Sequence, residues 1–136
     1  MTPQQAIEQL QNLAKNSKEA MRKAEFTVNN NIALTAIELA PEKTSLLVES
    51  IEILQDDTKS SVVVNAPYSG YVEFGTGPFA NEYVGGLPES WKDEAMKFFV
   101  NGEGHTQAHP FFYPAVQRHL PELIPEVEKE LEKLTQ

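Results

Sequence analysis

One helical stripe limits what the first part of this chain can fold into. Between residues 3 and 39, apolar side chains recur at intervals of three and four positions, which is the spacing of one face of an α-helix. The strongest stretches are Ala6, Ile7, Leu10, Leu13 and Ala14, and then Ile32, Ala33, Ala36, Ile37 and Leu39. Pro3 suits the first turn of a helix, and Pro41 disfavours helical geometry in the residue before it. The pattern predicts helix over residues 3–39, as one helix or as two in tandem that meet at Asn29-Asn30-Asn31.

Three segments with β-strand character follow this helix. Residues 46–54 alternate between two faces, residues 60–65 are rich in β-branched side chains, and residues 70–75 form a short aromatic run. Turn residues separate the segments and the connections are short, which favours antiparallel neighbours. The sequence therefore predicts a meander sheet of three to four strands over residues 46–75.

The second half of the chain divides into a loop region and a final helix. Glycines and prolines punctuate residues 76–110, where a short helix is expected from Trp91 to about Val100. Residues 114–134 carry a new helical stripe, which its two internal prolines should kink or restart. Together these elements predict one α+β domain over residues 1–136, with the C-terminal helix packed on the sheet.

Charge and residue content exclude several classes of function. The chain has no cysteine, so it has no thiolate zinc site, cysteine nucleophile or disulfide. Its 20 acidic residues outweigh 11 Lys and Arg, for a net charge of −9, whereas proteins that grip nucleic acid need clustered cations. An acidic surface instead suits a protein past which DNA slides without specific binding. The short basic cluster is interpreted as a solvated helix face and consists of Lys15, Lys18, Arg22 and Lys23.

Neither a membrane span nor a secretion signal is expected. No run approaches the roughly 18 apolar residues that a spanning helix needs. The N-terminal residues lack a basic segment followed by an apolar one. The protein is therefore expected in the cytoplasm, at least at first.

The stretch "EFGTGPFA", residues 73–80, invites a catalytic or a phosphate-binding interpretation. A phosphate loop needs a lysine and a helix start behind it, and neither is recognisable here. Glu73 could act as a general base if a partner group lay nearby, or it could hydrogen-bond loop backbone or a cation of a neighbouring subunit. Strand alternation would place Tyr71 and Glu73 on one face, with Val72 and Phe74 toward the core.

The histidines offer an alternative function, that of a small metal-dependent hydrolase. His105 and His109 lie four residues apart with Glu103 just before them, and His119 follows in the final helix. Three histidines could in principle gather a zinc ion. Glycines and a proline surround His105 and His109, so this segment is not expected to be helical. The two imidazoles would then not share one helix face. No acid–base motif accompanies them, and the sequence favours a protein that is not an enzyme and uses no cofactor or metal.

Three stretches, in order, resemble one family. "APEKTSLLVESIEI" (40–53) resembles a segment that leads into a first strand, and "APYSGYVEFGTG" (66–77) resembles the most characteristic piece of the family. "GHTQAHPFFYPAVQRHL" (104–120) resembles its closing piece. The family is that of the small neck or tail-completion proteins of long-tailed bacteriophages and prophages, the gp10-like family of phage HK97. The resemblance covers about residues 40–134 and departs from the family pattern at Ser45, where glycine is usual, and at the prolines of the last helix.

The resemblance implies a structural role in a virus particle. Proteins of this family are ring subunits between the head and the tail. The implied partners are further copies of the chain, head-completion or portal-side proteins, and tail terminator or tail tube proteins. The implied location is the head–tail junction of the virion, and the host cytoplasm during assembly. The resemblance implies no enzymatic activity.

The residues that match the family's motifs form the candidate assembly site. They are Tyr71, Glu73, Phe74, Gly75 and Thr76 in the signature stretch, and Pro110, Phe111, Pro114 and Ala115 in the closing stretch. Phe79 and Tyr83 join them, because exposed apolar side chains on the predicted 76–88 loop need a partner to cover them. A partner-binding module outside a virus remains a further possibility.

Overall fold

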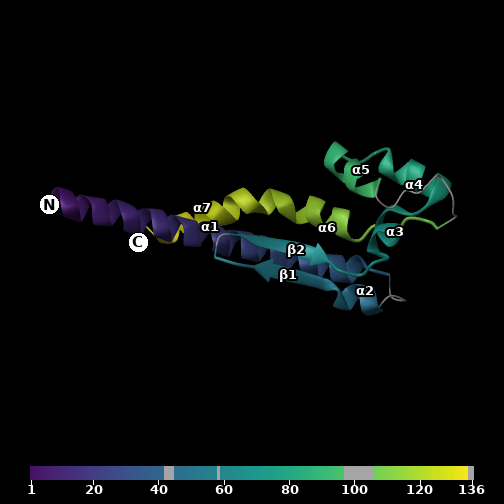
Figure 1. The fold of residues 1–136 in the computed structure, drawn as a ribbon, viewed down its shortest axis with the longest axis horizontal. Coiled ribbons are helices and arrows are strands. Elements are labelled where there is room, and N and C mark those ends of the chain that lie inside the picture. The colour runs from purple at the N-terminus through teal and green to yellow at the C-terminus, as the bar shows by residue number, and fades with distance from the viewer. Residues whose placement is uncertain (42–44, 58, 97–105, 135–136) are drawn as a thin grey trace.

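The protein is elongated around one long helix. The structure is a computed structural model that describes residues 1–41, 45–57, 59–96 and 106–134. In chain order its elements are α1 (Pro3–Leu39), α2 (Ser45–Glu49), β1 (Ile51–Gln55), β2 (Ser60–Val64), α3 (Ser69–Phe74), α4 (Gly77–Val84), α5 (Glu89–Ala95), α6 (Phe112–His119), the 3₁₀ turn η1 (Leu120–Glu122) and α7 (Leu123–Lys133). Figure 1 shows the hairpin and α6–α7 alongside α1, with α3, α4 and α5 gathered at one end.

Helix α1 runs without a break for 37 residues. At its start, the backbone N–H of Thr2 donates to the Gln5 side chain and the backbone N–H of Gln5 donates to the Thr2 hydroxyl, which is a capping box. At its end, Ala40 adopts an extended conformation before Pro41. The helix predicted over residues 3–39 is confirmed with both of its ends.

Two of the three asparagines in α1, Asn29 and Asn31, bind other elements, and the helix continues through all three. Asn29 Nδ2 donates to Ser60 Oγ at 2.9 Å, and Asn31 Nδ2 donates to Glu122 Oε1 at 3.1 Å. Their side chains therefore do not compete for the backbone hydrogen bonds of the helix. Of the two alternatives that the sequence left open, the single helix holds and the tandem pair is wrong.

The sheet is one hairpin instead of a meander. β1 and β2 pair antiparallel, with Ile51 opposite Val64 and Gln55 opposite Ser60. Within the described residues the sheet has two strands, so the predicted count of three to four is wrong. The front of the segment predicted as a strand at 46–54 is helix α2, in which Leu47 is fully buried.

The strand predicted over residues 70–75 is also wrong, because helix α3 occupies this segment. A strand would send Glu73 and Phe74 to opposite faces, whereas both are buried, at 3% and 4% exposed. Successive residues of an α-helix are rotated by about 100°, so both side chains can point inward together. Tyr71 is exposed on the same short helix.

The expected loop over residues 76–88 contains helix α4, which is a further correction. Pro78 is compatible with a first helical turn, because its missing N–H would have no partner there. Phe79 and Tyr83 are four residues apart, so the helix places both apolar side chains on the same side. The short helix expected from Trp91 is present as α5, and its predicted continuation beyond residue 96 lies outside the described residues.

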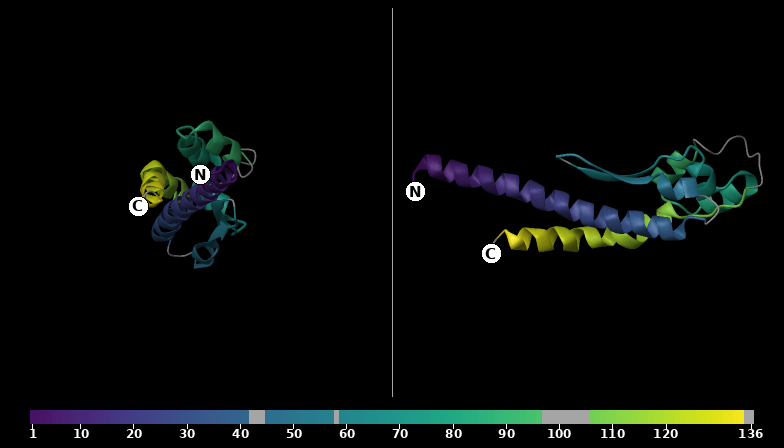
Figure 2. Two further views of the ribbon diagram at one scale, coloured as in Figure 1. Left: turned by 90° about the vertical axis from the view of Figure 1, so that its left-hand side faces the viewer. Right: turned by 90° about the horizontal axis from the view of Figure 1, so that it is seen from below.

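The final helical region is two helices joined by a 3₁₀ turn. Pro121 lies in η1, which confirms the expected restart at a proline. Pro125 lies in the first turn of α7, where the missing N–H costs no hydrogen bond. Helices α6 and α7 pack along α1, which lies between them and the hairpin (Figure 2). The prediction that the C-terminal helix packs on the sheet is therefore wrong.

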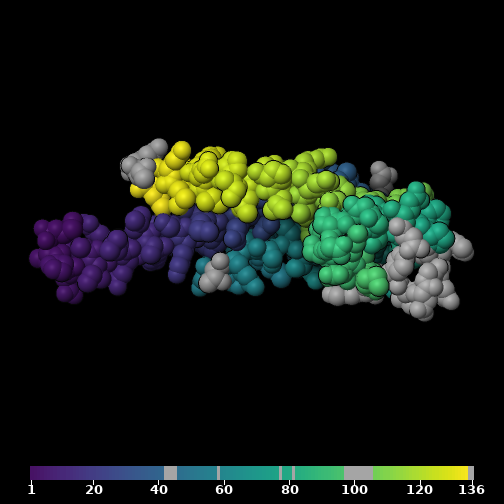
Figure 3. Space-filling model, turned by 90° about the horizontal axis from the view of Figure 1, so that it is seen from above, coloured from purple at the N-terminus to yellow at the C-terminus, as the bar shows by residue number. Residues whose placement is uncertain are grey.

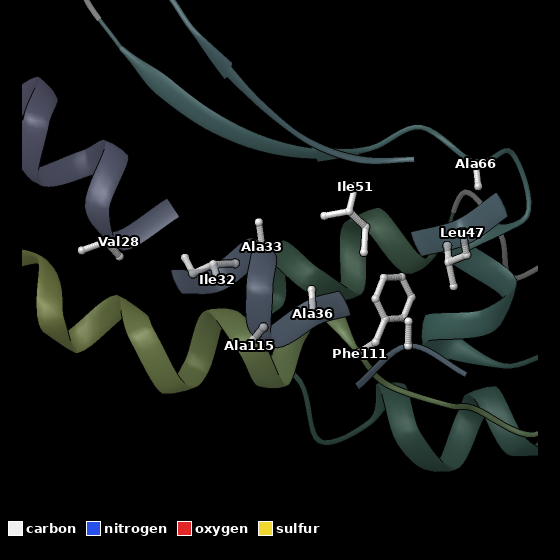
Figure 4. Packing of buried hydrophobic residues seen from close by; sticks show 10 residues of the cluster. Val28, Ile32, Ala33, Ala36, Leu47, Ile51, Ala66, Phe111 and Ala115 are labelled. Atoms are coloured by element: carbon white, nitrogen blue, oxygen red, sulfur yellow. The ribbon is translucent and has the colours of Figure 1, made fainter. Parts of the chain in front are cut away.

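The main core lies where α1 meets the hairpin and α6 (Figure 4). Ala36 and Ala115 are fully buried, and their small side chains allow α1 and α6 to approach closely. Phe111 fills the space beside them at 1% exposed. The buried residues of this core are Val28, Ile32, Ala33, Ala36, Ala40, Leu47, Ile51, Ala66, Phe111 and Ala115.

The N-terminal part of α1 extends past the rest of the protein (Figures 1 and 2). The buried residues of α1 begin at Ala20, whereas Ile7, Leu10 and Leu13 are 54%, 67% and 56% exposed. The apolar stripe thus runs the length of the helix, and the fold covers its C-terminal part. Within the described ranges, no helix combines the length and the hydropathy needed to cross a membrane.

Gly75 ends α3 in a conformation that a side chain would strain. Its φ is +76° and its ψ is −171°, a region that residues with a Cβ rarely adopt. A Cβ on Gly75 would also lie 2.8 Å from Ala108 N and 2.9 Å from Thr106 O, which are backbone atoms. Gly86 provides a contrast, because a Cβ there would meet Tyr83 O at an ordinary 3.8 Å.

We expect Gly75→Ala to lower the free energy of unfolding by about 2 kcal/mol or more, because backbone strain and the close contact add. Gly86→Ala should change it by less than about 0.5 kcal/mol. Urea denaturation of both variants measures the difference. Equal effects of the two substitutions would contradict the described geometry.

Candidate functional site

Glu73 caps helix α6 from inside the protein. Its Oε2 accepts the backbone N–H of Phe111 at 2.8 Å, and its Oε1 accepts the N–H groups of Phe112 at 3.0 Å and Tyr113 at 2.6 Å. The first N–H groups of a helix have no partner within the helix, and the phenylalanine at the cap position cannot accept a hydrogen bond. Glu73 supplies the missing acceptors from a position 38 to 40 residues earlier in the chain.

Burial and the end of α6 act on this carboxyl group in opposite directions. Burial raises the pKa of Glu73, and the weaker effect of the hydrogen bonds from the Tyr113, Phe111 and Phe112 backbone lowers it. The partial positive charge at a helix N-terminus favours the ionised carboxylate. Because both oxygens bind the helix backbone, the geometry makes Glu73 a positioning group for α6.

The geometry of Glu73 can be compared with the two interpretations made from the sequence. The hydrogen bonds to Phe111, Phe112 and Tyr113 match the interpretation in which Glu73 binds backbone. The expected orientation, with Glu73 facing away from the core, is wrong, because α3 is a helix and turns the side chain inward.

The two motif stretches also bind one another along their backbones. His109 N donates to Val72 O at 2.8 Å, and Thr76 N donates to Thr106 O at 2.8 Å. Thr106 N returns a hydrogen bond to Thr76 Oγ1 at 2.8 Å. Together with the Glu73 cap, these bonds join the signature stretch and the closing stretch into one unit, which we call the motif unit (residues 71–76 and 106–115).

The other candidate residues divide between the interior and the surface. Phe111 is buried in the main core, with Pro110 and Pro114 partly buried on either side of it in the chain. Tyr71 and Phe79 lie at the surface, at 39% and 37% exposed. The structure therefore separates residues that hold the fold from residues that present a surface.

An aromatic cluster holds α3, α5 and α6 together. Trp91 meets three rings edge to face, with centroid distances of 6.5 Å to Phe74, 5.8 Å to Phe112 and 4.9 Å to Tyr113. Such arrangements stabilise by about 0.5–1.5 kcal/mol for each pair beyond the burial of their area. Trp91 is therefore the residue through which α5 is fixed to the motif unit.

Tyr83 was expected as an exposed group on a loop, but this is wrong, because it lies on helix α4 and packs against this cluster. Its hydroxyl is buried and has no hydrogen-bond partner among the described residues. Burial raises the pKa of Tyr83 well above its usual range, and the nearby charge of Glu73 adds to the effect. Tyr83 is therefore neutral at physiological pH.

A hollow of about 510 Å³ lies beside the motif unit, between β2, α3 and α5. Apolar side chains dominate its lining, and Glu73 and Glu94 are its carboxylates. The Glu73 oxygens in this hollow already bind the α6 backbone.

A second polar network links α1 to the end of α6. Thr35 Oγ1 lies 2.7 Å from His119 Nε2, and His119 Nδ1 lies 2.7 Å from Glu122 Oε2. Asn31 completes the network through its bond to the other Glu122 oxygen. The order hydroxyl, imidazole, carboxylate is that of a hydrolase triad, but Thr35 is 7% exposed inside the contact between two helices, where a substrate cannot reach it.

This network was not predicted from the sequence. The spacing of His119 and Glu122, three residues apart on a helical stripe, was a usable signal for their contact. The contact with Thr35 spans 84 residues and had no local signal. The network holds the junction between α6 and η1 against α1.

The metal-dependent hydrolase gains no support from the described residues. His109 is exposed on a segment without helix or strand, while His105 and Glu103 lie outside the described residues. No group of three His, Asp or Glu side chains in the described part of the chain could hold a metal ion.

Removal of the Glu73 side chain should destabilise the protein strongly. We expect Glu73→Ala to lower the free energy of unfolding by about 2–4 kcal/mol, because it leaves the α6 N–H groups without acceptors in a buried site. Glu82→Ala, at an exposed position on α4, should change it by less than about 0.5 kcal/mol. Chemical denaturation measures both values. A Glu73→Ala protein as stable as Glu82→Ala would contradict the capping role.

The network around His119 predicts a dependence of stability on pH. The hydrogen bond from His119 lowers the pKa of Glu122, so this carboxylate contributes stability above its unfolded pKa of about 4.3 and loses it as the pH falls through the lower folded value. Glu122→Gln should therefore show a smaller loss of stability below about pH 4.5 than the unchanged protein. Glu128→Gln, on an exposed part of α7, serves as the control in denaturation at a series of pH values. Parallel pH profiles for Glu122→Gln and the unchanged protein would refute the network's role.

Comparisons of the whole chain with protein-family models, with curated proteins and with solved structures give no match. The functional interpretation therefore depends on the residues and on their geometry.

Proposed function

We propose that this chain is a structural protein of a tailed-bacteriophage or prophage virion. It acts as a ring subunit at the head–tail junction and works by protein–protein assembly. Its partners are further copies of itself, head-completion or portal-side proteins, and tail terminator or tail tube proteins.

The joined motif unit is the observation that carries the proposal. The stretches that resemble the neck and tail-completion family bind each other through Glu73 and through the backbone bonds of Val72 and Thr76. These hydrogen bonds give the two stretches a structural reason to occur in the same chain, and that reason requires no reaction with a substrate. This use of the motif fits a protein whose function resides in its surfaces.

The distribution of exposed groups also supports an assembly role. Tyr71 within the motif unit and Phe79 shortly after it in the chain are partly exposed aromatic residues, and Ile7, Leu10 and Leu13 expose aliphatic side chains on α1. Apolar groups that gather at the surface mark places where another protein binds. The net charge of −9 suits a protein beside a DNA channel, because repulsion between its carboxylates and the DNA phosphates opposes binding of the DNA.

Deletion of the gene from the phage or prophage that encodes it tests the proposal. Electron microscopy should show filled heads and complete tails that are not joined, and the intact gene supplied in trans should restore joining. Joined, infectious particles without the protein would refute the proposal.

A point variant tests whether the exposed aromatic surface is used. Phe79→Asp should lower the yield of joined particles at least about tenfold while the purified protein keeps its helix content, because Phe79 is partly exposed and a charge there opposes burial. Glu82→Ala on the same helix is the control and should join particles normally. Normal joining by Phe79→Asp would exclude this surface from the assembly contact.

A further inference from the structure

Strand β2 has an open edge on the side away from β1. The bond from Asn65 N to Ser50 O fixes the alternation of the antiparallel ladder, so the odd-numbered residues of β2 are those that bond to β1. The backbone groups of Ser60, Val62 and Val64 therefore point the other way. Among the described residues, no hydrogen bond reaches the backbone of Val62 or Val64 on this side.

The first residue of β2 confirms the direction of this edge. Ser60 N points away from β1 and donates to Glu25 Oε2 on α1 at 3.1 Å. Glu25 thus closes the edge at the end near the hairpin turn, and the N–H and C=O groups of Val62 and Val64 follow it. Such a row of unpaired N–H and C=O groups can pair with a strand of another chain.

β2 also lacks the charges by which edge strands commonly avoid strand addition. The stretch of residues 60–65 contains no ionisable side chain. β1 differs, because it carries the exposed Glu52 and is followed by Asp56 and Asp57. The hairpin therefore protects the outer edge of β1 with charge and leaves that of β2 unprotected.

Two hollows lie beside β2. The hollow of about 510 Å³ next to the motif unit reaches Val63 and Val64 at one end of the strand. A second hollow, of about 270 Å³, reaches Ser60 at the other end. Its apolar lining residues are Val28, Ile32, Leu120 and Leu123. The space-filling view shows the hairpin at the surface between α1 and α5 on this side, so the edge can be reached from solvent (Figure 3).

We propose that β2 binds an extended segment of another protein, which adds to the hairpin as a further strand. The backbone of the segment pairs with the open N–H and C=O groups of Val62 and Val64. Every second side chain of the segment then points to the same face as Val62 and Val64, which pack against the main core. The partner segment therefore has apolar residues at alternate positions and no proline at the positions that pair.

The charges around the edge favour a basic segment. The ionisable residues that line the two hollows are Glu25, Lys59, Glu73 and Glu94. Carboxylates thus outnumber the one lysine, and the chain as a whole carries a net charge of −9. A segment with Lys or Arg beside its apolar residues is attracted to this edge. A strand of a second copy is disfavoured, because each copy brings the same excess of carboxylates.

The inference goes beyond the role in head–tail joining, because it assigns a binding mode to β2, which is not part of the motif unit. Its test uses the purified full chain and a synthetic peptide. The outcome is therefore separate from that of the gene deletion, and either proposal can fail while the other holds.

A strand-forming peptide tests the edge directly. The probe is a fluorescent peptide of sequence Lys-Val-Thr-Val-Thr-Val-Lys, and fluorescence anisotropy should show that it binds the purified chain. Two analogues carry N-methyl groups, one on the valine amides and one on the threonine amides. Only one edge of the peptide faces β2, so one analogue should bind at least about tenfold more weakly and the other as the parent peptide does. No binding of the parent peptide, or equal binding of all three, would overturn the proposal.

The charge of the partner is tested with the same peptide after both lysines are replaced by glutamate. This acidic peptide should bind at least about threefold more weakly at low ionic strength, because the edge is bordered mainly by carboxylates. Tighter binding of the acidic peptide would overturn the proposed chemistry of the partner.

Two proline variants separate the two edges of the hairpin. Val62 and Ile53 lie opposite one another in the register, and both are partly buried against the main core. Their N–H groups point to opposite edges, so each proline removes an edge N–H and leaves the β1–β2 bonds in place. Val62→Pro should bind the parent peptide at least about tenfold more weakly, whereas Ile53→Pro should stay within about twofold of the unchanged chain. Equal effects of the two substitutions would overturn the proposal.

Amide exchange of the unchanged protein gives a test that needs no variant. A saturating amount of the peptide should slow exchange of the Val62 or Val64 N–H at least about tenfold, and should leave that of Ile53 unchanged. Binding without any slowing at β2 would overturn the proposal. Slowing that depends on protein concentration alone would identify a second copy as the occupant and would also overturn it.

Discussion

The capping of α6 by Glu73 is the interaction on which the rest of this structure depends. It places a carboxylate from α3 against three N–H groups at the point where the chain enters its final helices. The cost of burying the carboxylate is offset because the same group satisfies donors that would otherwise be buried without partners. Phe111 next to this cap fills the main core, so the cap also fixes the register of α6 on α1.

Helix α1 supplies the surface on which the other elements pack. The hairpin and the α6–α7 pair lie on different sides of its C-terminal part, and the His119 network and the Asn29 bond tie both to it. The N-terminal part of the same helix has no such cover within the described residues. One amphipathic helix thus forms the core of a small domain with its C-terminal part, while the apolar stripe on its N-terminal part stays exposed.

Agreement between sequence and structure depends on how local each signal is. The period of apolar residues over 3–39 and the restart at Pro121 were predicted correctly, because helix periodicity and proline sterics act over a few residues. The segment around Tyr71 was assigned as a strand because of its aromatic composition, and tertiary packing overrode this weak preference. In the six-residue helix α3, the adjacent residues Glu73 and Phe74 can both point inward, which a strand would not allow on one face.

Local patterns in the sequence predict the long helix, the hairpin strand at 60–64, the acidic character and the two motif stretches. Only the packing of whole elements joins these stretches, turns Glu73 inward and brings Thr35 to His119. It also decided which part of the α1 stripe is covered. The physical reason is distance along the chain: contacts that span 30 to 84 residues depend on how whole elements pack, and no local pattern encodes their geometry.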